Sequence, residues 1–214
     1  MQKLFFYLLV VIIACSCGRT AQQATDEQTP DSTLTISYAT GFKLDYFPHY
    51  KRVTVFNPWL KGKILSTYYL VTDKNTQTPD ASQTVRVPLT KLAVTSCTHF
   101  EFLAVLNELQ TVTGVCTPEL IYNETITAAY TQGKITSLGD AFNTNVERLL
   151  MLKPDALMLA SYNQQDDNAK HLATAGIPLL FNNEWTEQSL LGRAEWIKFV
   201  AAFYNKEAEA GQLF

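Results

Sequence analysis

The sequence contains few of the residue patterns from which enzyme active sites are usually built. Its three histidines, His49, His99 and His171, stand far apart, and no metal-ligand spacing surrounds them. There is no phosphate-binding P-loop, no dinucleotide-binding glycine fingerprint and no nucleophile elbow. The acids Asp166 and Glu184 have no evident partner in the sequence. These absences predict a protein that is not an enzyme and has no metal centre of its own.

The sequence also lacks a strong charge of either sign. It has 17 Lys and Arg residues against 20 Asp and Glu residues, and no basic stripe runs along it. This balance gives no reason to expect nucleic acid as a partner. Because 47% of its 214 residues are hydrophobic, the chain can bury a sizeable core and form an ordinary globular body.

The apolar run Leu4–Ile13 is too short to span a bilayer stably. It follows Lys3 and precedes small residues, an arrangement typical of an export signal. A cysteine directly after a small residue resembles the lipobox of bacterial lipoproteins, in which the cysteine becomes the lipid-modified N-terminus. We therefore predict a signal peptide over residues 1–17 and lipidation at Cys17, or alternatively at Cys15. A plain secretory signal with incidental cysteines is the other interpretation.

Residues 18–33 are polar and contain almost no apolar side chains. Such a segment cannot bury enough surface to offset its ordering entropy, so it is predicted to be a flexible tether. Leader and tether together predict a protein of the cell envelope, periplasmic or anchored to a membrane by its lipid.

From residue 34 to 88 the pattern is that of β-strands. Short runs of β-branched and aromatic residues alternate with turn formers such as Thr40-Gly41 and Asn57-Pro58. We expect hairpins packed on the edge of the main lobe, and not an independent domain. The predicted strands are Leu34–Tyr38, Phe42–Tyr46, Arg52–Phe56, Ser66–Thr72 and Val85–Pro88.

Residues 89–188 alternate short apolar strands with amphipathic helices. This alternation predicts a Rossmann-like α/β lobe, in which helices cover both faces of a parallel sheet. Thr98 and Glu101 fit a capping box at the start of one helix. Residues 189–214 are predicted to contain one long amphipathic helix. The predicted strands include Leu92–Thr95, Ala156–Leu159 and Pro178–Phe181, and the predicted helices include Asn145–Leu152 and Gln165–Ala175.

Ligands of such sheets bind beyond the carboxyl ends of the strands. Polar and aromatic residues follow the predicted strands there, which suits the recognition of a bulky small molecule. Tyr162 and Trp185 could stack on a ligand or cover the core, and Cys97 and Cys116 could form a disulfide or remain free. For His99 a capping or rim position is preferred to metal ligation. The predicted ligand-binding residues are Ser96, Thr98, His99, Tyr122, Ser161, Tyr162, Glu184 and Trp185.

The stretch Gly139–Leu159 carries a resemblance to a known family. Gly139 is followed by Asn145 two residues before Glu147, and an apolar helix then ends at Lys153-Pro154-Asp155 before an apolar strand. This pattern resembles the substrate-binding proteins of ABC importers for iron–siderophore complexes, haem and cobalamin. The resemblance extends from about Val85 to the C-terminus. The motifs Asn182-Asn-Glu-Trp185 and Leu191-Gly-Arg-Ala-Glu-Trp196 resemble the siderophore-type members.

The resemblance implies two lobes joined by one long rigid helix. The sequence would supply the N-terminal lobe and the interlobe helix over residues 189–214, with the second lobe missing, so it could be a fragment, a truncated reading frame or a partial gene model. It also implies a protein without a cofactor that captures a metal chelate, such as an iron(III)–siderophore, haem or cobalamin, and delivers it to an ABC permease. Glu147 would dock onto arginines of that permease.

An alternative function follows from the β-rich segment. A surface lipoprotein could use residues 34–88 to bind a partner protein or a glycan and have no transport role. A ligand-independent partner surface on that segment would support this alternative.

Overall fold

The computed structural model describes residues 29–163 and 167–214. The predicted signal peptide with Cys15 and Cys17, most of the predicted tether, and Asp166 lie outside the described residues. Within the described ranges, no helix combines the length and apolar character needed to cross a membrane.

The N-terminal segment forms a five-stranded sheet, here called the N-terminal sheet, with strands in sequence order. The strands are antiparallel up to β4, and β5 pairs with β4 in parallel. The strand predicted over Leu34–Tyr38 is wrong. The strand that pairs with β2 is Ser32–Thr33, one further hydrogen bond joins the N–H of Leu34 to Leu44, and the residues that follow form a loop. The strands are β1 (Ser32–Thr33), β2 (Phe42–Tyr46), β3 (Lys51–Phe56), β4 (Ile64–Val71) and β5 (Thr84–Arg86).

The α/β lobe is built on a five-stranded parallel sheet of order β12-β11-β6-β7-β8. The predicted parallel sheet is therefore confirmed. A small antiparallel pair, β9 and β10, lies between β8 and the next helix in the sequence. The strands are β6 (Leu92–Val94), β7 (Val112–Val115), β8 (Thr136–Ser137), β9 (Gly139–Asp140), β10 (Asn143–Thr144), β11 (Ala156–Leu159) and β12 (Leu179–Phe181).

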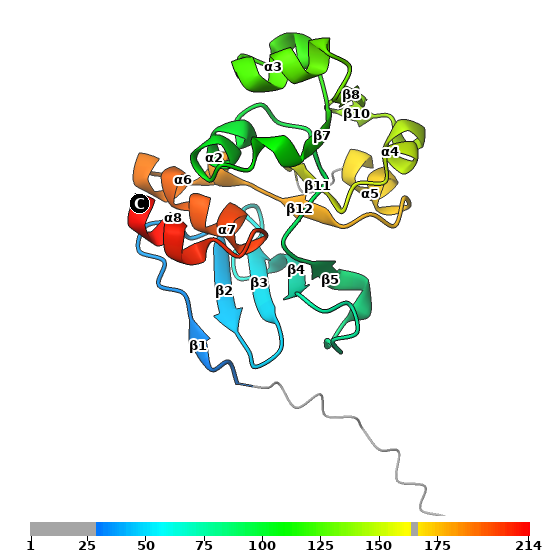
Figure 1. Cartoon of the computed structure of the whole chain (residues 1–214). Helices are drawn as coiled ribbons and strands as arrows, with labels where there is room; N and C mark the ends of the chain where they lie inside the picture. Colours follow the sequence, from blue (N-terminus) through cyan, green and yellow to red (C-terminus); the bar gives the residue numbers. More distant parts are fainter. Residues whose placement is uncertain (1–28, 164–166) are drawn as a thin grey trace, which may run out of the picture.

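Alternate residues of the parallel strands point to opposite faces, and each face is covered by different helices. Met158 packs in a core that contains residues of α2, α3 and the C-terminal helix α7 (Ile197–Ala202). Its neighbours Leu157 and Leu159 pack in a second core with residues of α4 and α5. Helices therefore cover both faces, as predicted, and Figure 1 shows the two groups on opposite sides. The helices are α2 (His99–Val105), α3 (Glu124–Thr131), α4 (Val146–Leu152) and α5 (Asp167–Ala173).

The Lys153-Pro154-Asp155 motif joins α4 to the sheet. Lys153 ends the helix in the left-handed conformation, with φ of 50°. One carboxylate oxygen of Asp155 accepts hydrogen bonds from the backbone N–H of Thr90 (2.7 Å) and of Lys91 (2.9 Å). These bonds outweigh the effect of burial and lower the pKa of Asp155. The motif thus fixes the chain just before β6 against the chain just before β11.

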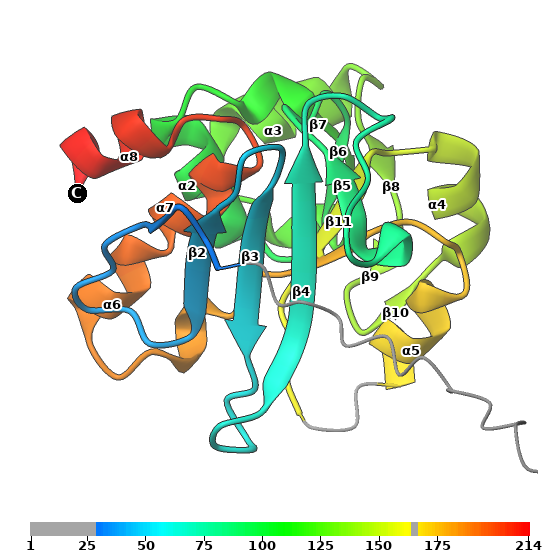
Figure 2. The same cartoon turned by 90° about the horizontal axis from the view of Figure 1, so that it is seen from below.

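The C-terminal region is not the single long helix that was predicted. It contains α6 (Leu190–Glu195), α7 (Ile197–Ala202) and α8 (Glu207–Leu213). The break before α8 occurs at Asn205, which has a φ of 57°. Every residue of α7 is buried, because α7 packs in the core shared with the N-terminal sheet and α2. Figure 2 shows α6 and α7 beside β2, on the side away from α4 and α5.

Two buried carboxylates hold the loop that precedes β2. Glu195 accepts hydrogen bonds from three consecutive backbone N–H groups, those of residues 37–39. Glu187 accepts from the N–H groups of Thr40 (2.9 Å) and Gly41 (2.8 Å) and from the indole of Trp196 (3.0 Å). Because these amides are bonded to carboxylates, they cannot join a strand ladder, which explains the missing strand.

We predict that Gly41→Ala destabilises the chain by about 1–3 kcal/mol, because it overpacks the core. A Cβ atom at Gly41 would lie 2.6 Å from Cζ2 of Trp196 and 3.1 Å from a carboxylate oxygen of Glu187. Urea unfolding measures the effect. Gly211→Ala is the matched control, since nothing lies within 4 Å of its added Cβ and alanine favours the surrounding helix. Equal stability of Gly41→Ala and the wild type would contradict the packing described here.

Candidate functional site

The carboxyl ends of β6 and β12 meet in a cluster of polar side chains. The hydroxyl of Thr98 donates to Glu184 (2.7 Å) and also contacts the Ser96 hydroxyl (3.0 Å). Nε2 of His99 lies 3.2 Å from the carbonyl oxygen of Asn182 and 3.5 Å from the other Glu184 oxygen. The sequence thus correctly placed Ser96, Thr98, His99 and Glu184 at one edge of the sheet.

The cluster corrects two expectations about its members. Thr98 does not form the predicted capping box, since its hydroxyl is bonded to Glu184 and makes no cap hydrogen bond. Glu184 is not an isolated acid. Burial alone would raise its pKa, but His99 and Thr98 outweigh burial and lower it below its ordinary value. Glu184 therefore stays ionised.

His99 and Glu184 are both buried, His99 completely. They therefore lie beneath the surface at this edge of the sheet and hold the loops above them in place. The loop after β11 is tied to the loop after β12 in a similar way, because Asn183 accepts from the N–H of Ser161 (2.8 Å) and its amide lies 3.3 Å from the Ser161 hydroxyl. The residues that follow these anchors, Tyr162 and Trp185, are exposed.

Three exposed aromatic side chains form a row along this edge, here called the aromatic row. The rings of Tyr162 and Trp185 are stacked, with centroids 5.8 Å apart and an angle of 26° between their planes. Phe142 lies at the turn between β9 and β10, and the centroid of its ring is 4.9 Å from that of Tyr162. The sequence analysis did not include Phe142 among the site residues, although an aromatic residue at the tip of a polar turn indicates an exposed side chain.

A cavity of about 210 Å³ lies under one end of the aromatic row. Phe142 and Tyr162 line it, together with Thr95 at the end of β6. Neutral polar groups of Asn163 and Asn168 and the carboxylate of Asp167 complete its polar lining. The edge of the sheet therefore offers flat aromatic surfaces beside a small polar hollow, an arrangement that suits a bulky ligand with both apolar and polar parts.

Other predicted site residues lie outside this group. Tyr122 is exposed over 89% of its surface, and no ring contact joins it to the aromatic row in the described structure. Cys97 is exposed, Cys116 is buried, and both are free thiols. Burial raises the pKa of Cys116 to about 11, so it stays protonated at neutral pH. Among the described residues, no group of His, Cys, Asp and Glu could hold a metal ion.

Glu147 occupies the first turn of α4 and is exposed. Asn145 caps this helix by accepting a hydrogen bond from the N–H of Arg148 (2.9 Å). The asparagine that precedes the glutamate by two residues therefore fixes the start of the helix. In consequence the Glu147 carboxylate is presented to solvent.

The comparison with protein families identifies one match. A family described as "periplasmic binding protein" matches residues 92–214, which is more than half of the chain. The structure of a siderophore-binding protein with two acinetobactin molecules and ferric iron has a TM-score of 0.52 and 18% identity, covering 75% of this chain and 48% of that one. A petrobactin-binding protein of Bacillus subtilis has a TM-score of 0.51 and 12% identity over the same shares. These two likenesses show the fold alone.

Relatives from Methanocaldococcus jannaschii include two lipoproteins. One uncharacterized lipoprotein is 29% identical over 141 residues, which are 63% of this chain and 34% of the relative. A second uncharacterized lipoprotein is 22% identical across 97% of this chain and 57% of its own length. The chain thus spans between about a third and a little over half the length of these relatives.

Proposed function

Because the chain belongs to the periplasmic binding protein family, as its sequence predicted, we propose that it is the substrate-binding component of an ABC importer. The proposed ligand is a metal chelate, namely an iron(III)–siderophore complex, haem or cobalamin. The chain would capture it in the cell envelope and deliver it to the permease. Capture involves no bond chemistry, and transport energy would come from ATP hydrolysis in another polypeptide.

The aromatic row is the observation that carries this proposal. Tyr162 and Trp185 present stacked rings to solvent at the carboxyl ends of the strands, where ligands of parallel sheets bind. Exposed aromatic faces stack favourably on conjugated ligands, and the anchors His99, Glu184 and Asn183 hold the two loops in place. A rigid rim of this kind loses little entropy when a ligand binds.

Calorimetric titration of the chain tests the proposal. The probes are a ferric hydroxamate siderophore, a ferric catecholate siderophore, haemin and cyanocobalamin, each compared with its metal-free or truncated counterpart. The proposal requires saturable binding of at least one metal complex and weaker binding of its counterpart. Absence of saturable binding by all four would contradict it.

We also propose that Glu147 docks the chain onto the permease. Its carboxylate stands at a helix start, where the helix dipole favours negative charge, and it is free to form a bidentate pair with a partner arginine. Glu147→Ala should reduce uptake of the ligand by about tenfold or more, while ligand affinity stays unchanged. Uptake of the radiolabelled chelate by cells that carry the variant measures this.

Glu124→Ala is the matched control for Glu147→Ala. Glu124 is also an exposed glutamate in the first turn of a helix, α3, after an asparagine cap. Normal uptake with Glu124→Ala and reduced uptake with Glu147→Ala would support docking. Equal uptake by the two variants would contradict it.

A further inference from the structure

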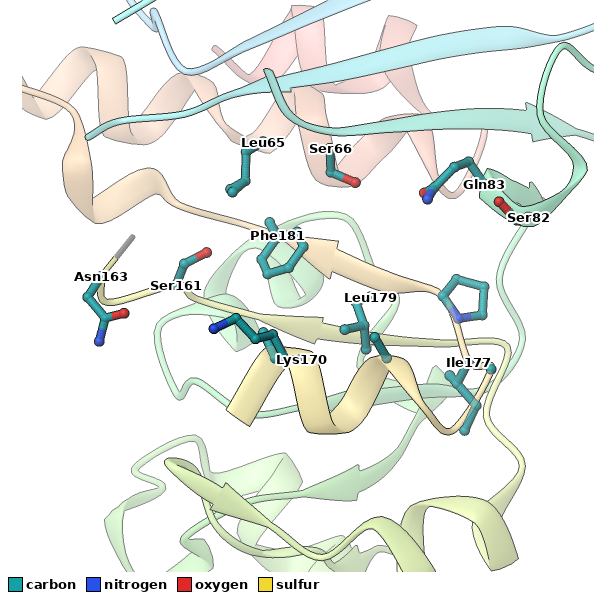
Figure 3. Close-up of a pocket in the computed structure, with 14 residues that line it drawn as sticks. Leu65, Ser66, Ser82, Gln83, Ser161, Asn163, Lys170, Ile177, Leu179 and Phe181 are labelled. Atoms are coloured by element: carbon teal, nitrogen blue, oxygen red, sulfur yellow. The ribbon is translucent and has the colours of Figure 1, made fainter. Parts of the chain in front are cut away.

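A larger cavity, of about 570 Å³, lies at the seam between the N-terminal sheet and the β12 edge of the parallel sheet (Figure 3). Its size is typical of a pocket for a small ligand. No residue of the aromatic row lines it. The cavity adjoins the proposed chelate site, since Asn163 lines both it and the smaller cavity, but it opens between the two sheets and not under the aromatic rings.

The middle of this seam cavity is mostly apolar, with Ser66 as a polar residue beside Leu65. Figure 3 shows Leu65 of β4 on one side, and Phe181 and Leu179 of β12 on the other. Ile177 extends the apolar lining, and Gln83 adds an amide at the end near β5. A ligand in this space would bury apolar side chains between the two sheets.

The wall formed by β12 is the free edge of a sheet, because β12 is the outermost strand. The carbonyl of Pro178 and the N–H of Asn182 form hydrogen bonds with β11. Backbone groups of successive residues point alternately to the two sides of a strand, so the N–H and C=O groups of Leu179 and Phe181 point away from β11. The N–H of Phe181 donates a hydrogen bond to the Tyr68 hydroxyl (2.9 Å). The outward N–H and C=O of Leu179 have no strand beside them in the described structure. They are a donor and an acceptor for an extended chain.

Lys170 is the one charged residue among the described residues that line the seam cavity. Its ammonium lies 2.8 Å from Asp167, and the two side chains are 65% and 89% exposed. An ion pair so exposed contributes little free energy, so the ammonium can exchange this partner for another carboxylate. In Figure 3 Lys170 points toward the Ser161 end of the cavity.

We propose that the seam cavity binds a short apolar peptide, which lies as an added strand beside β12 and pairs its C-terminal carboxylate with Lys170. The peptide backbone would form hydrogen bonds with the N–H and C=O of Leu179. Its apolar side chains would pack against Leu65 and Phe181, and its carboxylate would pair with the Lys170 ammonium. A fatty acid of similar length would match the apolar lining and the charge, but it would leave the Leu179 groups unpaired. The site fits the mode of recognition in which an extended ligand adds to a sheet edge.

The test is a calorimetric titration of the chain with the tripeptide Leu-Val-Leu, its C-terminal amide, an analogue with N-methylated central amide, and decanoate. We expect the free peptide to bind about tenfold more tightly than the amide, since it alone brings the carboxylate for Lys170. N-methylation should weaken binding by a similar factor, because it removes the donor for the Leu179 carbonyl. Decanoate should bind more weakly than the peptide.

Two variants at exposed positions of α5 keep the test independent of folding. Ala173→Trp fills the cavity and should abolish binding, and Lys170→Gln should remove the difference between the free peptide and its amide. Lys134→Gln, at an exposed lysine that does not line the cavity, is the control. The proposal is overturned if the peptide does not saturate the chain, if Ala173→Trp leaves binding intact, or if decanoate binds as tightly as the peptide.

Discussion

Glu195→Ala is expected to lower the free energy of unfolding by about 3–5 kcal/mol, since it breaks a buried ionic network. The Glu195 carboxylate is fully buried and accepts hydrogen bonds from the N–H groups of Ser37 (2.9 Å), Tyr38 (2.6 Å) and Ala39 (2.8 Å). It also accepts from the Lys198 ammonium at 2.7 Å. Alanine would leave three amides and one ammonium without their acceptor.

The pH dependence of this variant follows from the same contacts. Burial would raise the pKa of Glu195, but Lys198 and the three amides outweigh it and lower the pKa below 4.5. The folded chain therefore binds this proton less readily than the unfolded chain does. The stability from Glu195 is complete above the unfolded pKa and is lost as pH falls through the folded pKa. The difference between wild type and Glu195→Ala should accordingly shrink at acid pH.

Urea unfolding at pH 7 and at acid pH measures both effects. Glu119→Ala is the control, because Glu119 is an exposed acid and its removal should change stability by less than about 0.5 kcal/mol. Equal unfolding midpoints for Glu195→Ala and Glu119→Ala at pH 7 would contradict the anchoring role of Glu195.

Replacing both Tyr162 and Trp185 by alanine should weaken binding of the chelate by about 30- to 100-fold, which corresponds to roughly 2–2.7 kcal/mol. Tyr162 and Trp185 are 44% and 38% exposed at this edge of the sheet, so a ligand can reach both rings. Each single substitution should have a smaller effect, and Phe142→Ala should act in the same direction. Calorimetric titration of the variants measures these losses.

Leu120→Ala is the control for the aromatic variants. Leu120 is an exposed apolar residue, at 55% of its surface, outside the aromatic row and outside the cavity below it. Its affinity for the chelate should equal that of the wild type. An unchanged affinity in the Tyr162 and Trp185 double variant would show that the chelate binds elsewhere.

The pattern of apolar residues was sufficient to predict the parallel sheet, because each of its strands is marked by a local feature of the sequence. Ala156–Leu159 is an unbroken apolar run bounded by a Lys-Pro-Asp turn, and a strand buried on both faces requires such a run. The C-terminal helices could not be predicted in this way. Their apolar residues recur at helical spacing, but the break at Asn205 depends on a backbone conformation that sequence spacing does not indicate.

Two residues of the candidate site could be located from the sequence, because their position after a strand determines where they lie. Tyr162 and Trp185 follow strands directly, so topology alone brings them to one edge of the sheet. Phe142 was missed because it reaches that edge from the turn between β9 and β10. The role of Glu195 was missed because its partners, residues 37–39, are more than 150 positions away in the sequence.

The three tryptophans allow one measurement to decide where the ligand binds. Trp185 lies in the aromatic row, Trp196 is fully buried in the core, and Trp59 lies in the loop between β3 and β4 of the N-terminal sheet. In an NMR titration with the gallium(III) form of the chelate, only the indole N–H signal of Trp185 should shift and saturate. A shift of the Trp59 signal with an unchanged Trp185 signal would contradict the account and favour a binding surface on the N-terminal sheet.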